Sequence, residues 1–276
     1  MKPVSTWAAI ESARESRSAC GGLGYSFYSR FGELIATSEV NQTWEGENYV
    51  MIQQAIRYIL KNYSNLMQGK NTMKTLEFMD LDLEEEYKFE GSLNSLNDLE
   101  KLLAYNANKL VHESINRIQE ETMKEEGEAL SKSDIWEKHL FYTFIPMAKA
   151  YCEHFTLTCY IKFLEKLDDS PKSRLVFEKL ALLHLHNLII KEGSYREIFS
   201  SEQTDELRES CIQLNKELRP EMVALTYTMS FTDYDVGAIG QSNLQSYTNF
   251  MNDVKNTPGC FDKPKEWKFL YENNSV

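Results

Sequence analysis

Two acidic residues that flank a glycine are the first candidates for chemistry. They lie in the segment Trp44-Glu45-Gly46-Glu47, directly before a stretch of helical pattern. A carboxylate that is held in a dry pocket has its pKa raised toward neutrality, which makes it a competent general base. Glycine at position 46 lets the backbone pass close to a bound ligand. By themselves, however, these residues are better explained as helix-start acids that stabilise the positive amino end of the following helix.

A glycine-rich run lies upstream of these acids. It reads Cys20-Gly21-Gly22-Leu23-Gly24, and Gly22 and Glu45 are 23 positions apart. Glycines that lie close together suit either a backbone that approaches a ligand or the end of a helix. The run alone does not separate these two interpretations.

The histidines and cysteines show no pattern of a metal site or a disulfide framework. His184 and His186 are two positions apart and point to different faces of a helix, and three further histidines lack partners at ligand spacing: His112, His139 and His154. The five cysteines are an odd number without a CxxC pair, which predicts reduced, mostly buried thiols. We therefore expect no metal, and we expect Cys152 and Cys159 to share a core-facing side of one helix.

The elements that must position these residues all have a helical pattern. Apolar spacing predicts one helix over 5–20, with Ser5 as its N-cap, and a second over 48–66. Residues 21–44 between them are expected to form an irregular connection. Further helices are predicted over 96–124, 133–167, 170–191, 204–228 and 243–255. Since no alternating pattern long enough for a sheet is found, the predicted fold class is all-α.

A polar stretch with the acidic run Glu84-Glu85-Glu86 indicates a surface linker. We therefore expect three parts: a partial helical bundle over 1–68, an acidic linker over 69–95, and a carboxy-terminal helical domain over 96–276.

Composition excludes two classes of partner. The net charge of −12 and the acidic isoelectric point argue against a protein that binds the phosphate backbone of a nucleic acid. No run of about 18 apolar residues predicts a membrane span, and the amino-terminal residues lack the apolar core of a secretory signal.

Two pairs of motifs resemble one known superfamily. The segments Cys20–Ser26 and Thr43–Asn48 are similar to the glycine loop and the aromatic-Glu-Gly motif of acyl-CoA dehydrogenases and oxidases. Downstream, Leu218–Leu225 and Phe231–Tyr234 resemble the carboxy-terminal domain of the oxidases, which the dehydrogenases lack. Because the motifs occur in the family's order, the likeness covers nearly the whole chain and favours the oxidase branch. Leu23 departs from the family pattern, which often has His there.

The resemblance implies a partial acyl-CoA dehydrogenase-type bundle followed by the oxidase carboxy-terminal domain. It implies that Glu45 takes the α proton of a fatty acyl-CoA while FAD accepts the β hydride, giving trans-2-enoyl-CoA and hydrogen peroxide. It also places Cys20, Gly21 and Gly22 against a flavin, often that of a neighbouring subunit. Glu47 and Asn48 follow as further flavin contacts, and Gly46 as a residue beside the substrate.

Family subunits begin with a helical and a β-barrel domain that hold much of the FAD, whereas this chain starts part-way through the helical bundle. Three hypotheses follow: an oxidase or oxidase half, acting as a homodimer or with a full-length oxidase; a non-catalytic paralogue that associates with one; and a helical interaction protein. The intact Trp44-Glu45-Gly46 segment favours the first. The family implies the peroxisome, although the final residues, Asn273–Val276, are not a Ser-Lys-Leu type address.

Overall fold

The computed structural model describes residues 1–70, 73–83, 87–124, 129–167, 170–241, 243 and 245–272, the side chains of 270–272 excepted. Every regular element in these ranges is helical, so the all-α prediction is confirmed. The acidic run Glu84–Glu86 and the final residues Asn273–Val276 lie outside the described residues.

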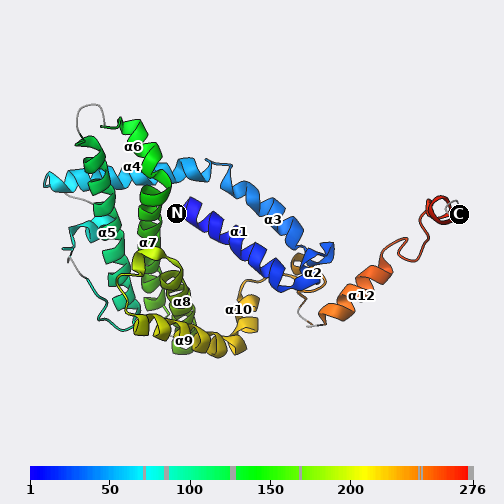
Figure 1. Ribbon diagram of the computed structural model, residues 1–276. Coiled ribbons are helices and arrows are strands. Elements are labelled where there is room, and N and C mark those ends of the chain that lie inside the picture. Colours follow the sequence, from blue (N-terminus) through cyan, green and yellow to red (C-terminus); the bar gives the residue numbers. More distant parts are fainter. Residues whose placement is uncertain are drawn as a thin grey trace. The chain divides into compact units, whose positions relative to one another are not determined.

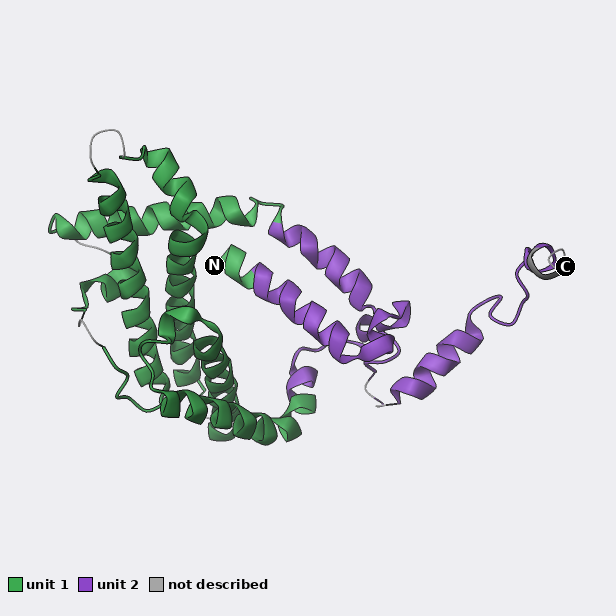
Figure 2. Cartoon of the chain, viewed as in Figure 1, with its two compact units in different colours: residues 1–5, 43–224 green, residues 6–42, 225–276 purple. Residues whose placement is uncertain are grey.

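The chain forms two compact units (Figure 2). Unit 1 contains Met1–Ser5 and Thr43–Ala224, and unit 2 contains Thr6–Gln42 and Leu225–Val276. Each unit is a group of residues in contact and combines separate stretches of the chain. The units therefore do not test the division of the sequence at residues 68 and 96, which stays a prediction.

Unit 1 is built from long helices (Figure 1). They are α4 (Asn48–Met67), α5 (Leu96–Thr122), α6 (Lys132–His139), α7 (Ile145–Glu165), α8 (Pro171–Lys191), α9 (Ser201–Leu218) and the start of α10 (Met222–Thr228). A single π-helical turn, Leu140–Phe144, joins α6 to α7. Serine hydroxyls cap α5, α6 and α9, each accepting from the backbone N–H three residues on, as N-caps do. The helical prediction for this region is confirmed, but the stretches predicted as single helices over 133–167 and 204–228 are each divided, the first by the π turn and the second by the 3₁₀ turn Arg219–Glu221.

The core of unit 1 centres on α5, whose buried face packs on α7, while α8 packs on α9. Leu99, Leu102 and Leu103 of α5 are almost completely buried. The polar segment before α5 also contributes to packing, because Phe89 and Leu93 join this core. Its 3₁₀ helix Lys74–Asp80 buries three apolar side chains, those of Leu76, Phe78 and Met79. A stretch whose composition indicates a surface linker thus carries residues that fix it to the bundle.

Unit 2 contains most of α1 (Lys2–Ala19), α2 (Gly21–Tyr25), α3 (Phe31–Glu39), α11 (Asp233–Val236), α12 (Ser246–Asn256) and α13 (Trp267–Glu272). Helix α1 lies beside α3 (Figure 1), and Arg14 and Glu39 form an ion pair of 2.6 Å between them. The amino-terminal and carboxy-terminal parts of this unit also meet. The Arg30 guanidinium donates to the Tyr234 carbonyl oxygen at 2.6 Å, and the Tyr28 and Thr257 hydroxyls are 2.7 Å apart.

Three expectations about the amino-terminal region and the cysteines are wrong. Helix α1 begins at Lys2 rather than Ser5, since Pro3 suits a first helical turn and the Ser5 hydroxyl donates to the Met1 and Lys2 carbonyls instead of capping. Residues 21–44 are largely helical. All five cysteines are free, but three of them are exposed, and Cys159 does not share the burial of Cys152.

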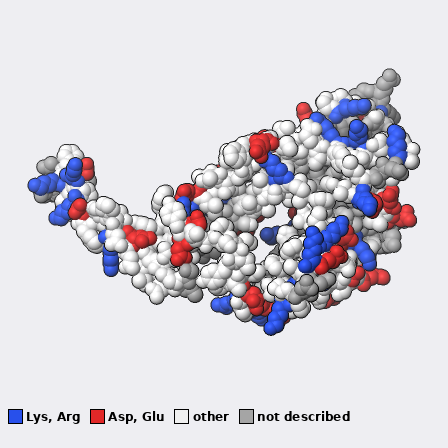
Figure 3. All heavy atoms as spheres, turned by 180° about the vertical axis from the view of Figure 1, so that it is seen from behind, with Lys and Arg blue, Asp and Glu red and all other residues white. Residues whose placement is uncertain are grey.

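Charge on the described surface is mixed in sign. On the face in Figure 3, Lys and Arg side chains alternate with Asp and Glu in small groups. No helix among the described residues is long and apolar enough to cross a membrane.

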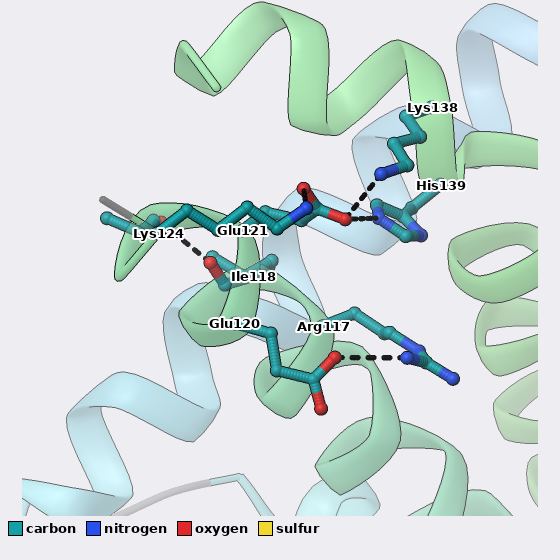
Figure 4. A network of polar contacts seen from close by, with 8 residues as sticks. Arg117, Ile118, Glu120, Glu121, Lys124, Lys138 and His139 are labelled. Carbon is teal, nitrogen blue, oxygen red and sulfur yellow. Dashed lines mark hydrogen bonds and ion pairs between the residues drawn. The ribbon is translucent and has the colours of Figure 1, made fainter. Parts of the chain in front are cut away.

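One buried carboxylate connects α5 to α6 (Figure 4). The Glu121 side chain is only 8% exposed, and it accepts from Lys124 at 2.7 Å, from Lys138, and from His139 at 3.3 Å. The hydrogen bonds from Lys124 and then Lys138 lower the pKa of Glu121 to about 2. Lys138 and His139 belong to α6, so their contacts with Glu121 hold the carboxyl end of α5 against α6, while Lys124 follows α5 itself.

We expect Glu121→Gln to lower the midpoint of thermal unfolding at pH 7 by several degrees, because the neutral amide cannot keep three cationic or polar donors together. A carboxyl whose pKa is lowered by folding stabilises the protein above its unfolded value of 4.5 and loses that contribution as pH falls toward about 2. The variant should therefore lose less stability than the wild type in melts recorded across this pH window. Glu120→Gln is the matched control, since Glu120 pairs with Arg117 in solvent; equal shifts in both variants would refute the role of Glu121.

Candidate active site

The turn before α4 carries the candidate base. Helix α4 begins at Asn48, and Glu47 is its N-cap, with the Glu47 carboxylate accepting from the Val50 backbone N–H at 3.0 Å. Glu47 is therefore a helix-start acid, as one interpretation of the sequence held. Glu45 differs, because it lies outside the helix in the left-handed region, with φ at 55°, and its side chain is exposed.

Gly46 continues the left-handed backbone with φ at 104°. An added Cβ there would come within 2.6 Å of the Met51 sulfur, so both the conformation and the space favour glycine. The glycine after Glu45 thus has a reason within the chain itself, and its predicted place beside the substrate stays a prediction.

Residues at the start of the chain anchor this turn. The Lys2 ammonium donates to the Gly46 carbonyl oxygen and, at 3.4 Å, to the Asn48 side-chain oxygen. The Asn48 amide in turn donates to the Pro3 carbonyl oxygen at 3.5 Å, and Asn48 is only 1% exposed. Sequence analysis missed Lys2, because nothing local indicates a contact across 44 positions. We call Lys2, Pro3, Gly46 and Asn48 the Lys2 clamp.

The predicted flavin loop lies in unit 2, at the end of α1. Gly21 has φ at 58° and takes the left-handed position that ends a helix, and Gly24 is required because its Cβ would lie 2.0 Å from the Arg17 carbonyl oxygen. Gly22 is different: an added Cβ would meet nothing within 4 Å, and its φ is not left-handed. Cys20, Gly21 and Gly22 are all exposed.

These observations test how well the residues fit a flavin. The backbone at Gly21 and Gly22 is open to solvent, so a planar ring system has room to approach it. The side chains of Glu47 and Asn48 are already engaged at the start of α4, so any flavin contact from them must use the remaining atoms. The structure places Glu45 to Asn48 together in unit 1 and the glycine loop in unit 2.

Unit 1 also has a cleft of about 600 Å³ between the 3₁₀ segment, α5 and α7. Phe78, Tyr105 and Phe155 line it, and Glu45 does not. Within the same cleft the His154 ring nitrogen Nε2 and the Glu100 carboxylate are 2.7 Å apart, which lowers the pKa of Glu100. Among the described residues, no group of three or more His, Cys, Asp or Glu is arranged to hold a metal ion.

Comparison with protein families defines the class. An acyl-CoA oxidase family model matches residues 95–273, and the model of the acyl-CoA oxidase C-alpha1 domain matches residues 1–60. Together with the helical fold, these matches show that the chain belongs to the acyl-CoA oxidase family.

Curated relatives and solved structures agree with this assignment. An acyl-coenzyme A oxidase of Debaryomyces hansenii is 30% identical over 92% of the chain, and the peroxisomal acyl-coenzyme A oxidase 1 of Mus musculus is 25% identical over 94%. A Caenorhabditis elegans acyl-CoA oxidase-1 structure, complexed with FAD and ATP, has a TM-score of 0.87 over 99% of the chain at 20% identity, which shows the shared fold. The chain spans about two fifths of these proteins, 36%, 40% and 41% respectively.

Gly46→Ala should destabilise the protein by more than about 1 kcal/mol, because alanine is strained at this φ and its Cβ displaces Met51. Gly193→Ala is the control in the same unit, since Gly193 has open space and no left-handed φ. That variant should be neutral or more stable by up to about 1 kcal/mol. Urea unfolding measures both, and a Gly46→Ala variant as stable as Gly193→Ala would show that the turn is not constrained.

Proposed function

We propose that this chain is the part of an FAD-dependent acyl-CoA oxidase that supplies the catalytic base, Glu45. The substrate is a fatty acyl-CoA and the products are trans-2-enoyl-CoA and hydrogen peroxide. The observation that carries the proposal is the left-handed conformation of Glu45, followed by Gly46 in the same region. The proposed reaction comes from membership of the acyl-CoA oxidase family, and the conformation of the turn is the reason to choose Glu45 as the base.

A left-handed backbone is costly for glutamate. Residues other than glycine lose about 1–2 kcal/mol in this conformation, and such strain concentrates at functional sites. Helix α4 does not need Glu45 for capping, because Glu47 performs that role. The strained conformation therefore presents a carboxylate that the local fold does not otherwise use.

The reaction needs a proton acceptor for the α carbon of the thioester. Glu45 would take that proton, and a bound FAD would supply the acceptor for the β hydride and the reaction with oxygen that gives peroxide. A base of sufficient strength must be shielded from water, yet Glu45 is exposed among the described residues. Substrate, flavin or additional protein must therefore cover Glu45 in the active state.

The glycine loop is the proposed flavin contact within this chain. Cys20, Gly21 and Gly22 offer an exposed backbone, and Gly22 has no packing reason to be glycine. Glu47 and Asn48 contribute by fixing the start of α4 beside Glu45, and Gly46 gives the substrate close access to the backbone.

An apolar surface of unit 1 supports association with another subunit. Val50 and Trp44 are more than half exposed near the turn, and so are Phe141 and Tyr142, with the Phe141 and Tyr49 rings in edge contact at 5.7 Å. Exposed aromatic groups of this kind mark interaction sites. We propose a homodimer or a complex with a full-length acyl-CoA oxidase, located in the peroxisome as the name of the mouse relative indicates.

The same surface also supports a second candidate function. A non-catalytic paralogue that associates with a full-length oxidase would need the apolar surface but not the base. The exposed Glu45 carboxylate is the observation that favours this alternative.

The test is the visible spectrum of the purified chain with FAD, followed by a peroxide assay with a long-chain acyl-CoA. In an active preparation, Glu45→Gln should lower kcat by about 100- to 10,000-fold, as loss of a general base does. Glu137→Gln, an exposed carboxylate of α6, should leave kcat unchanged. If no flavin binds and the chain adds no peroxide, either alone or beyond what a full-length oxidase forms without it, the catalytic proposal is wrong and the paralogue is favoured.

A further inference from the structure

The Lys2 clamp connects the first residues of the chain to the turn that carries the proposed base. We propose that Lys2 is a positioning residue that holds the Glu45-Gly46 turn in its left-handed conformation. This inference rests on the proposed function for its catalytic consequence. Its structural part stands on contacts within unit 1 alone.

Lys2 contacts the backbone carbonyl of Gly46, the residue after Glu45. The Gly46 carbonyl lies before the N-cap Glu47 and outside the helix, whose first backbone hydrogen bond runs from the Met51 N–H to the Glu47 carbonyl at 2.9 Å. The Gly46 carbonyl oxygen is instead taken by the Lys2 ammonium. Hydrogen bonds from an ionised donor are about twice as strong as neutral ones, so this contact fixes the orientation of the peptide.

Lys2 also contacts the buried side-chain amide of Asn48. Its oxygen accepts from Lys2 and its nitrogen donates to Pro3, so both ends of the side chain are used while only 1% of the residue is exposed. Buried polar groups are costly when left without partners. Loss of Lys2 therefore removes a donor from two acceptors, one on each side of the N-cap.

Helix α1 is divided between the two units. Met1–Ser5 belong with Thr43 and the residues after it, whereas the rest of α1 belongs to unit 2 (Figure 2). Within unit 1, Lys2 and Pro3 contact the start of α4, and Met1 also reaches α7, where its sulfur lies 4.0 Å from the Thr156 hydroxyl.

Loss of the Lys2 clamp is expected to lower kcat by changing the orientation of the Glu45 carboxylate. Without the clamp, the left-handed turn relaxes toward ordinary backbone conformations, because the strain at Glu45 is then unopposed. The carboxylate keeps its chemistry but loses its fixed orientation. Misplacement of a reacting group lowers kcat more than it changes KM.

Amide hydrogen exchange of the full chain tests the clamp without requiring activity. Lys2→Met keeps the aliphatic stem and removes the donor, and it should speed exchange in the peptide covering Thr43–Met51 by about tenfold or more. Peptides from the middle of α5 should not change. Lys61→Met is the matched control, since Lys61 is an exposed lysine of α4, and it should have no effect on the turn.

A second variant and a rescue make the result specific. Asn48→Ala should speed exchange at the same peptide, and adding Lys2→Met to it should have less than the additive effect, because the two residues share one set of contacts. Lys2→Arg retains a charged donor and should restore part of the protection. Unchanged exchange in Lys2→Met overturns the proposal, whatever the activity.

The peroxide assay supplies the catalytic part. In an active preparation, Lys2→Met should lower kcat by about tenfold or more at nearly constant KM, and Lys2→Arg should recover part of it. If exchange responds but no preparation forms peroxide, the clamp stands and the proposed function fails. If exchange responds and kcat does not, Lys2 stabilises the turn without positioning the base, and the positioning role is wrong.

Discussion

The left-handed backbone at Glu45 and Gly46 is the constraint on which the site depends. It lies directly before α4, where Glu47 caps the helix and Glu45 stays outside it. Two neighbours contact the turn: the Met51 side chain fills the space that a Cβ at position 46 would need, and the Lys2 ammonium donates to the Gly46 carbonyl oxygen. The position of the carboxylate therefore depends on residues both before and after it in the chain.

Sequence patterns predicted the helices well where local physics decides them. The apolar stripe of α4 and the serine caps of α5 and α9 are short-range signals, and these helices begin at or within a few residues of the predicted ends. The region 21–44 was predicted to be irregular because its glycines and serines break the pattern, yet its short helices form with support from contacts more than 200 positions away, such as Arg30 with Tyr234. Lys2 and the buried residues Phe78 and Phe89 were missed for the same reason.

The two units show why family membership does not by itself establish activity. Unit 1 has a well-packed core and buried polar contacts such as those of Glu121, so its stability does not require the candidate base. The Glu45 side chain is exposed, and so are the aromatic side chains near it. The packing of unit 1 therefore carries no information on whether Glu45 acts as a base, and the chain spans only about two fifths of its relatives.

The fold accounts for some of the candidate site residues and leaves others without a structural role. Glu47 caps α4, Gly21 ends α1, and Gly24 avoids a clash with Arg17, so none of these three needs a ligand to account for it. Glu45 and Gly22 remain. Glu45 occupies a strained conformation without a capping role, and Gly22 leaves open space where any side chain would fit. Because strain at Glu45 carries a cost and the space beside Gly22 is unused, contacts within the chain do not account for either residue, and each by itself fits the proposed role in ligand binding.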